Sequence, residues 1–158
     1  MRLSWPKVML LWEHLSKHKS LFSDMTKGDV ENFLRYLTSP DTLWLELRKN
    51  NELTGIMTLD GLYRVVDLEA HFLTLDRDLA GKVTICRRAI AWTFDNFAAN
   101  RLTVQVPAWY HTTVRFAQSL GFRIEGKKRG AVLINGRWSD MFTLGLLRSE
   151  ANGIHGKD

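Results

Sequence analysis

The stretch RLTVQVPAWYHTTVRFAQSLGFRIEG, residues 101–126, decides the fold of this chain. Leucine and valine at positions 102, 104 and 106 alternate with polar residues, which is the period of a strand. Pro107 ends that strand because proline has no amide hydrogen to donate. A short helix is predicted from Thr112 to Leu120, Gly121 stands where a helix end needs a positive φ, and Phe122 begins another strand. The stretch therefore predicts a strand, a splayed junction, a helix and a strand in immediate succession.

A long hairpin is predicted downstream of this stretch. Asn135 and Gly136 are the best short turn signal in the chain, because both residue types tolerate a positive φ. Strands are predicted on either side of the turn, over residues 131–134 and 138–147. The last ten residues are polar and contain glycine. We therefore expect one domain over residues 1–148 and a flexible C-terminal tail over residues 149–158.

Upstream, helical periodicity gives way to strand periodicity. Apolar stripes at helical spacing predict one helix that starts near Ser4 and a second around residues 30–37. Pro40 separates these helices from the strands that follow. Strands are predicted over residues 42–49, 53–59 and 63–75, the first two joined by a tight turn at Asn50-Asn51, and a helix over residues 80–98.

The composition is that of a single globular domain. The chain has 158 residues, of which 45% are apolar and 25% charged, and this length suffices to bury a core. Its one cysteine, Cys86, excludes an intramolecular disulfide and is typical of a reducing compartment, so we expect a cytoplasmic protein. The apolar run near the N-terminus is interrupted at Glu13 and His14, which makes it too short for a signal peptide or a membrane span.

The formal net charge of +5 would suit an acidic partner, either the phosphates of coenzyme A or a nucleic acid. The densest basic cluster is Lys127-Lys128-Arg129, in a predicted strand. Such a cluster is either the solvated edge of a sheet or a binding patch. The five histidines show no metal-ligand spacing with acidic partners, so no metal site is predicted.

Several residues of the C-terminal half form a signature. They are Leu120-Gly121-Phe122, Glu125-Gly126, Arg129, Asn135-Gly136-Arg137-Trp138 and Asp140. In this pattern and in the order of its elements, nearly the whole chain resembles the GNAT (GCN5-related N-acetyltransferase) superfamily, especially its ribosomal-protein N-acetyltransferase branch. The resemblance implies an α/β (α+β) acyl-CoA N-acyltransferase fold, with a mixed, mostly antiparallel sheet flanked by helices. The first strand of the family is missing or vestigial, because only residues 1–3 precede the first helix.

The resemblance also implies a place for acetyl-CoA, where two neighbouring strands splay apart. In the family, the pantetheine arm pairs with strand backbone and the pyrophosphate meets the amides that begin the next helix. The matching residues are Leu73, Thr74 and Leu75 in the strand, and Gly81, Lys82, Val83 and Thr84 at the helix. Three signature positions of the phosphate loop are replaced, by Ala80, Val83 and Ile85. This loop is therefore degenerate, and a loop that only caps the helix is the alternative.

Candidate acid–base residues lie on the same predicted strand. Asp67, Glu69 and His71 alternate with apolar residues, so the three side chains share one face. The resemblance implies that Glu69 helps to deprotonate the amine, with His71 and Asp67 as further candidates. The alternative is a face that is simply exposed to solvent.

The start and the middle of the last helix hold two further family positions. Tyr110, with His111 beside it, is a candidate proton donor, or else only lines the junction. The tyrosine that serves as general acid in the family maps to Ala117, which has no proton to donate.

The resemblance therefore implies an acyl-CoA-dependent N-acyltransferase that moves an acetyl group to an amine of a small molecule or a protein. The replaced family residues motivate an alternative, a catalytically silent GNAT-fold protein that acts through protein contacts. The runs WPKVMLLWEHLSKHKSLF and TLWLEL resemble bacteriophage GNAT-like proteins, some of them head-assembly proteins, so its partners would then be virion proteins in the host cytoplasm. Direct nucleic-acid binding has only the net charge in its favour. The sequence names neither the acceptor nor the oligomeric state.

Overall fold

The computed structural model describes residues 5–17, 29–64, 66–75 and 80–151. Its helices are α1 (Trp5–Leu15), α2 (Val30–Leu37), α3 (Val83–Asn96, preceded by a 3-10 turn at Ala80–Lys82), α4 (His111–Ser119) and α5 (Arg148–Ala151). Its strands are β1 (Thr42–Lys49), β2 (Glu52–Asp60), β3 (Asp67–Thr74), β4 (Arg101–Pro107), β5 (Arg123–Ile134) and β6 (Arg137–Leu147). The strands form one sheet in the order β1-β2-β3-β4-β6-β5, and only β3 and β4 are parallel. The predicted mixed, mostly antiparallel sheet is confirmed.

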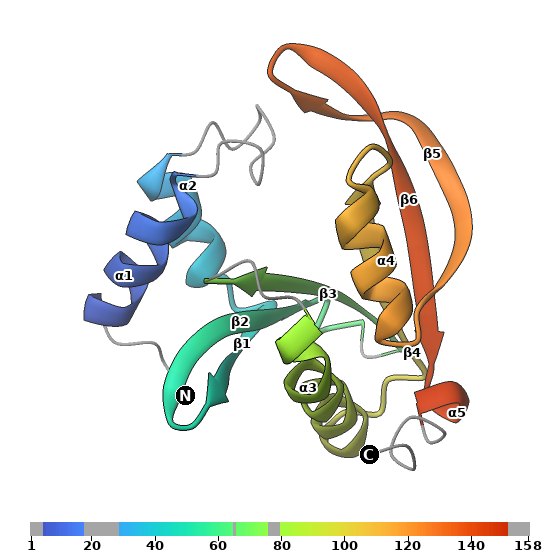
Figure 1. Ribbon diagram of the computed structural model, residues 1–158, viewed down its shortest axis with the longest axis horizontal. Coiled ribbons are helices and arrows are strands. Elements are labelled where there is room, and N and C mark those ends of the chain that lie inside the picture. The colour runs from blue at the N-terminus through green and yellow to red at the C-terminus, as the bar shows by residue number, and fades with distance from the viewer. Residues whose placement is uncertain (1–4, 18–28, 65, 76–79, 152–158) are drawn as a thin grey trace.

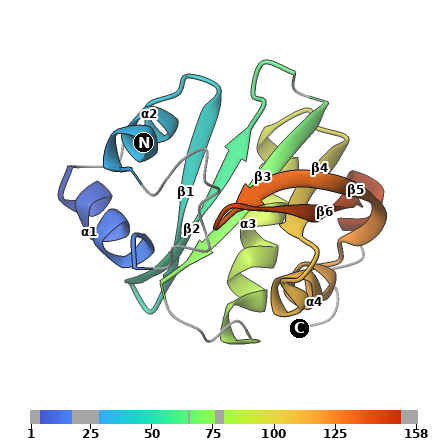
Figure 2. The ribbon, with the colours of Figure 1, turned by 90° about the horizontal axis from the view of Figure 1, so that it is seen from above.

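Helices cover both faces of this sheet, with α1 and α2 on one side and α3 on the other (Figure 1). Successive side chains of β2 point to opposite faces of the sheet, which explains the two layers. Ile56 packs with residues of α1 and α2, whereas Met57 and Leu59 face the main core together with α3 residues such as Ile90. The sheet is strongly twisted, and the β5–β6 hairpin runs across the direction of β1 to β3 (Figure 2). The prediction of a missing or vestigial first strand concerns residues 1–3, which lie outside the described residues.

Both predicted tight turns are confirmed by their backbone angles. Asn50 and Asn51 have φ values of 50° and 68°, and Asn135 and Gly136 have φ values of 50° and 70°. Two consecutive positive φ angles give a turn whose twist matches that of the strands it joins. Asparagine and glycine adopt this conformation most readily, which is why these two pairs were readable in the sequence.

Three predicted boundaries differ from the structure. The strand expected from residue 63 begins at Asp67, because a turn at Gly61, with a φ of 85°, occupies the preceding residues. The helix expected over residues 80–98 ends at Asn96, since Phe97 has an extended backbone. The tail expected from residue 149 overlaps α5, where Ala151 is buried. Residues 152–158, the rest of that predicted tail, lie outside the described residues.

The basic cluster Lys127-Lys128-Arg129 lies on β5, at the edge of the sheet. All three side chains are exposed, which protects an edge strand from pairing with other chains. Lys127 forms an ion pair of 3.0 Å with Asp140 on β6. The hairpin that carries the cluster extends past the end of α4 (Figure 1). The cluster therefore occupies a solvated edge, one of its two predicted positions.

The end of the sheet is tied to the end of α3 by Arg148. Its Nε donates to the carbonyl oxygen of Ala99 at 2.9 Å, and its Nη2 donates to that of Phe97 at 2.5 Å. Its Nη1 donates to the carbonyl oxygen of Phe94, and the guanidinium lies 5.3 Å from the centre of the Phe94 ring. The side chain of Arg148, which directly follows β6, thus joins the end of β6 to the end of α3.

Candidate active site

The two parallel strands separate shortly after they meet. β3 and β4 pair over three positions, from Asp67 opposite Arg101 to Glu69 opposite Thr103. Beyond Glu69, β3 pairs with β2 alone, and β4 continues with β6 alone. A cavity of about 210 Å³ lies in the gap. The predicted splayed junction is therefore an open space between two strand edges.

The cavity is lined by residues 70–74 of β3, residues 104–106 of β4, and Thr113, Phe116 and Ala117 of α4. Phe72 and Phe116 meet edge to face, with ring centres 6.5 Å apart. Ala117 occupies the position of the family's general-acid tyrosine, and the structure places it in the lining of the cavity. Thr113 precedes Ala117 by one helical turn and adds a hydroxyl group to the lining. Sequence reasoning missed Thr113, although its i−4 spacing from Ala117 was a usable signal.

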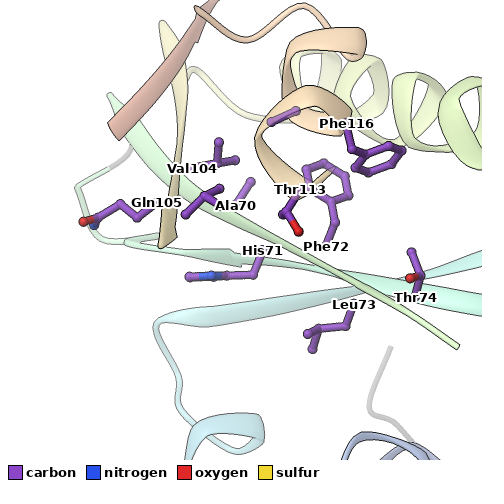
Figure 3. Close-up of a pocket in the computed structure, with 11 residues that line it drawn as sticks. Ala70, His71, Phe72, Leu73, Thr74, Val104, Gln105, Thr113 and Phe116 are labelled. Atoms are coloured by element: carbon purple, nitrogen blue, oxygen red, sulfur yellow. The ribbon is translucent and has the colours of Figure 1, made fainter. Parts of the chain in front are cut away.

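His71 and Gln105 line the polar end of the cavity. They come from β3 and β4, and their side chains extend to the same side, away from Phe116 (Figure 3). Glu69 contacts both residues, because its Oε1 accepts a hydrogen bond of 3.0 Å from Nε2 of Gln105 and lies 3.7 Å from Nε2 of His71. Nζ of Lys128 in turn donates to Oε1 of Gln105 at 2.9 Å. The face of β3 on which Glu69 and His71 were predicted to lie together therefore borders the cavity.

A second carboxylate, that of Asp60, also lies near Nε2 of His71. Oδ2 of Asp60 is 3.2 Å from Nε2 of His71 and accepts a hydrogen bond of 2.7 Å from the hydroxyl of Tyr36. Oδ1 of Asp60 accepts a hydrogen bond of 2.6 Å from Thr42. Burial would raise the pKa of Asp60, but the hydrogen bonds from His71, Thr42 and Tyr36 outweigh it and hold that pKa below its usual value. Asp60 is therefore an ionised group in contact with His71, which lines the cavity.

Asp67, the remaining candidate on the predicted strand face, has another role. Its Oδ1 accepts a hydrogen bond of 2.7 Å from Thr103, and its Oδ2 lies 3.4 Å from Nε of Arg101. These contacts join β3 to β4 at the positions where the strands still pair. Asp67 is not one of the residues that line the cavity.

Tyr110 and His111 lie at the start of α4, outside the lining of the cavity. The Tyr110 ring lies against the Trp109 ring, with centres 3.8 Å apart, and packs on the main core. His111 is exposed. Of the predicted catalytic residues, the structure places Glu69 and His71 together and Tyr110 apart from them.

The predicted phosphate loop leads into α3. Gly81 and Thr84 are exposed, and the cap residue Lys82 provides no side-chain hydrogen bond to the helix end. Lys82 is buried, with only 3% of the residue exposed. Val83 and Ile85, which replace small residues of the family pattern, are half-buried and pack against the main core. Their bulk is thus directed at the core, and exposed backbone remains at Gly81.

The predicted strand positions Leu73 and Thr74 both line the cavity. Leu75 follows the end of β3 and, with Leu73, packs against the cluster formed by α1 and α2. The described residues contain no group of three or more side chains arranged to hold a metal ion. Within the same residues, no helix is long and apolar enough to cross a bilayer.

Comparison with known families defines the class of protein. A family model described as an acetyltransferase (GNAT) domain matches residues 11–143. The chain therefore belongs to the GNAT acetyltransferase family. No curated protein is significantly similar to it in sequence.

Solved structures of acetyltransferases share the fold. Spermidine N-acetyltransferase from Vibrio cholerae, in complex with CoA and spermine, superposes with a TM-score of 0.79 at 15% identity, covering 96% of both chains. Mutant forms of the spermidine/spermine N-acetyltransferase SpeG from Vibrio cholerae give a TM-score of 0.77 at 15% identity, covering 97% of this chain and 95% of theirs. A structure described as a probable acetyltransferase gives 0.72 at 20% identity, covering 94% of this chain and 92% of its own. At these identities the likeness concerns the fold.

Proposed function

We propose that this chain is an acyl-CoA-dependent N-acyltransferase that transfers an acetyl group to an amine. The observation that carries the proposal is the cavity between β3 and β4, with the proton acceptors Glu69 and His71 at its polar end. Family membership supports the same reaction class. Acetyl-CoA supplies the activated acetyl thioester when it is bound.

The residues present fit acetyl-CoA at two places. Leu73 and Thr74 offer the edge of β3 that β4 leaves unpaired, so their backbone groups would hold the pantetheine amides. The start of α3 would hold the pyrophosphate, since the amides and dipole of a helix N-terminus attract anions. Gly81, Lys82, Val83 and Thr84 are the residues in question, and exposure of Gly81 allows close approach to the main chain.

Proton transfer would involve the pair beside the cavity. An amine must lose a proton as it attacks a carbonyl group, and a carboxylate or an imidazole can accept that proton directly or through a water molecule. Glu69 is held by Gln105, which fixes its position relative to the gap. Tyr110 is a weaker candidate for proton donation, because it does not line the cavity.

The alternative is a silent GNAT-fold protein that acts through protein contacts, such as a bacteriophage assembly module. The alanine at position 117 and the replaced phosphate loop are the observations in its favour. None of the comparisons reported above supports a phage role. The two functions differ in one measurable property, which is binding of acetyl-CoA.

Calorimetry with acetyl-CoA is therefore the first experiment. Saturable binding is expected, and no heat at millimolar ligand would refute the enzyme proposal. Turnover can then be followed by release of the CoA thiol with a chromogenic disulfide, since the only cysteine, Cys86, is fully buried. Spermidine and spermine are suitable first acceptors because of the structural neighbours, and peptides with a free N-terminus test the resemblance to the ribosomal-protein branch.

Two variants assign the base. Glu69→Gln and His71→Gln should each lower kcat while leaving the acetyl-CoA affinity nearly unchanged, and loss of a general base lowers the rate by about 10²–10⁴-fold. Asp95→Asn is a control on the exposed side of α3, where the carboxylate makes no hydrogen bond or ion pair with any described residue. Unaltered turnover in Glu69→Gln would remove that residue from the mechanism.

A further inference from the structure

His71 has two acidic neighbours, but only one lies within hydrogen-bond distance. Nε2 of His71 is 3.2 Å from Oδ2 of Asp60 and 3.7 Å from Oε1 of Glu69. Hydrogen bonds from a nitrogen donor to oxygen span about 2.7–3.2 Å, so Asp60 is within reach of Nε2 and Glu69 is not. The register of the sheet explains the contact, because Thr58 and Asp60 of β2 face His71 and Glu69 of β3.

Asp60 is anchored from two other elements. Thr42 of β1 donates to its Oδ1, and Tyr36 of α2 donates to its Oδ2. Burial raises the pKa of Tyr36 above its ordinary value, so this phenol keeps its proton and remains a donor. The Tyr36 ring also lies edge-on to the His71 ring, with centres 6.4 Å apart and an interplanar angle of 87°. The carboxylate and the imidazole therefore have fixed relative positions.

An ionised carboxylate only accepts hydrogen bonds, whereas a neutral imidazole has one donor nitrogen and one acceptor nitrogen. The nitrogen that faces the carboxylate must then carry the proton. In His71 this nitrogen is Nε2, which leaves the lone pair on Nδ1. Asp60 thus selects between the two tautomers of the neutral ring.

We propose that Asp60 is a positioning residue, which holds His71 in the Nε2–H tautomer so that Nδ1 accepts the proton of the acceptor amine. One proton moves from the amine nitrogen to Nδ1, and the imidazole becomes an imidazolium ion beside Asp60 and Glu69. The inference rests on the proposed function, because His71 lines the cavity in which the amine would react. It adds a residue from β2 that neither the sequence nor the family comparison had assigned.

The tautomer is measurable in the protein without any ligand. In ¹⁵N-labelled protein, at a pH where the His71 signals no longer move as the pH rises, long-range ¹H–¹⁵N correlation spectra distinguish a protonated from an unprotonated ring nitrogen. Wild-type His71 should show a protonated Nε2 and an unprotonated Nδ1. A protonated Nδ1 in the wild type would overturn the proposal, whatever happens in any variant.

Asp60→Ala then removes the acceptor. We expect His71 to show averaged signals of both tautomers and kcat to fall by about 10–100-fold, the range found when the partner that orients a metal-binding histidine is removed. The KM for acetyl-CoA should change by less than about threefold, because the substitution removes no contact that binds acetyl-CoA in the ground state. Asp95→Ala, the same substitution at an exposed site on α3, should leave the spectrum and the rate unchanged.

The outcomes separate this inference from the proposed function. If acetyl-CoA binds and turns over, but Asp60→Ala keeps a single tautomer and normal kcat, the positioning role falls and the acyltransferase stands. If acetyl-CoA does not bind to the wild type, the proposed function falls. Because the wild-type tautomer is read without ligand, a failure of Asp60→Ala to fold still leaves one decisive measurement.

Discussion

Replacing Arg148 would test how the last strand is tied to α3. The guanidinium donates to three carbonyl oxygens, those of Phe94, Phe97 and Ala99, at the end of α3 and just after it. The last carbonyl groups of a helix have no partner within the helix, so a side chain that reaches them satisfies groups that would otherwise need water. A positive charge at this end also interacts favourably with the helix dipole.

We expect Arg148→Met to lower the free energy of unfolding by about 2–4 kcal/mol. A hydrogen bond to a charged group contributes about 1.5–3 kcal/mol, and a cation at a helix C-terminus contributes about 0.3–1 kcal/mol. The cation–π contact with Phe94 adds about 0.5–1 kcal/mol. We take less than the sum, because Arg148 is partly exposed and methionine retains some of its packing. The melting temperature should fall by about 5–15 °C in a domain of this size.

Urea unfolding followed by circular dichroism measures the loss directly. Arg148→Lys should lose about half as much, since an ammonium group cannot reach three carbonyl groups with the geometry of the guanidinium. Arg115→Met is the matched control, because Arg115 is exposed and makes no hydrogen bond with any described residue. A change below about 0.5 kcal/mol in Arg148→Met, the range of ordinary surface substitutions, would refute this account of the anchor.

Three further predictions concern the cavity and its surroundings. Ala117→Leu fills part of the cavity, so calorimetry should show acetyl-CoA affinity reduced by at least about tenfold, or 1.4 kcal/mol. Burial raises the pKa of Asp60, but hydrogen bonds outweigh burial and lower that pKa below its ordinary value. The ionised Asp60 carboxylate therefore stabilises the folded protein above about pH 4, and this stabilisation is lost as the pH falls through the folded-state pKa. Urea midpoints should therefore fall more steeply on acidification in wild type than in Asp60→Asn. Burial raises the pKa of Cys86 to about 12, so a thiol reagent should label it near pH ~8 only after unfolding, and labelling of the native protein would contradict its burial.

The fold was largely predictable because its signals are local. Pro107, Gly121 and the two asparagine-containing turns act through their own backbone preferences, and each is found where it was expected. The prediction that a strand begins at residue 63 was wrong, because a turn occupies the residues before Asp67. Tyr63 to Val66 read as strand by residue type, but the turn at Gly61 and the contacts that close it begin the strand at Asp67.

The site was predictable only along single strands and helices. Alternation put Glu69 and His71 on one face, and helical spacing put Ala117 beside the gap. Asp60 and Tyr36 carried no such signal, because their relation to His71 depends on the register of β2 with β3 and on the packing of α2. Tyr110 was placed by counting in the family pattern, and its ring packs against Trp109 instead of lining the cavity.

The short pairing of β3 with β4 has a consequence for how the molecule would respond to a ligand. Among the residues that the structure describes, three residue pairs form the only ladder between one half-sheet, made of β1 to β3, and another, made of β4 to β6. A ligand that pairs with the free edges would act as a partial seventh strand and would complete the sheet across the gap. The width of that gap depends on the angle between the half-sheets, so residues that set the twist far from the cavity would tune affinity without touching the ligand.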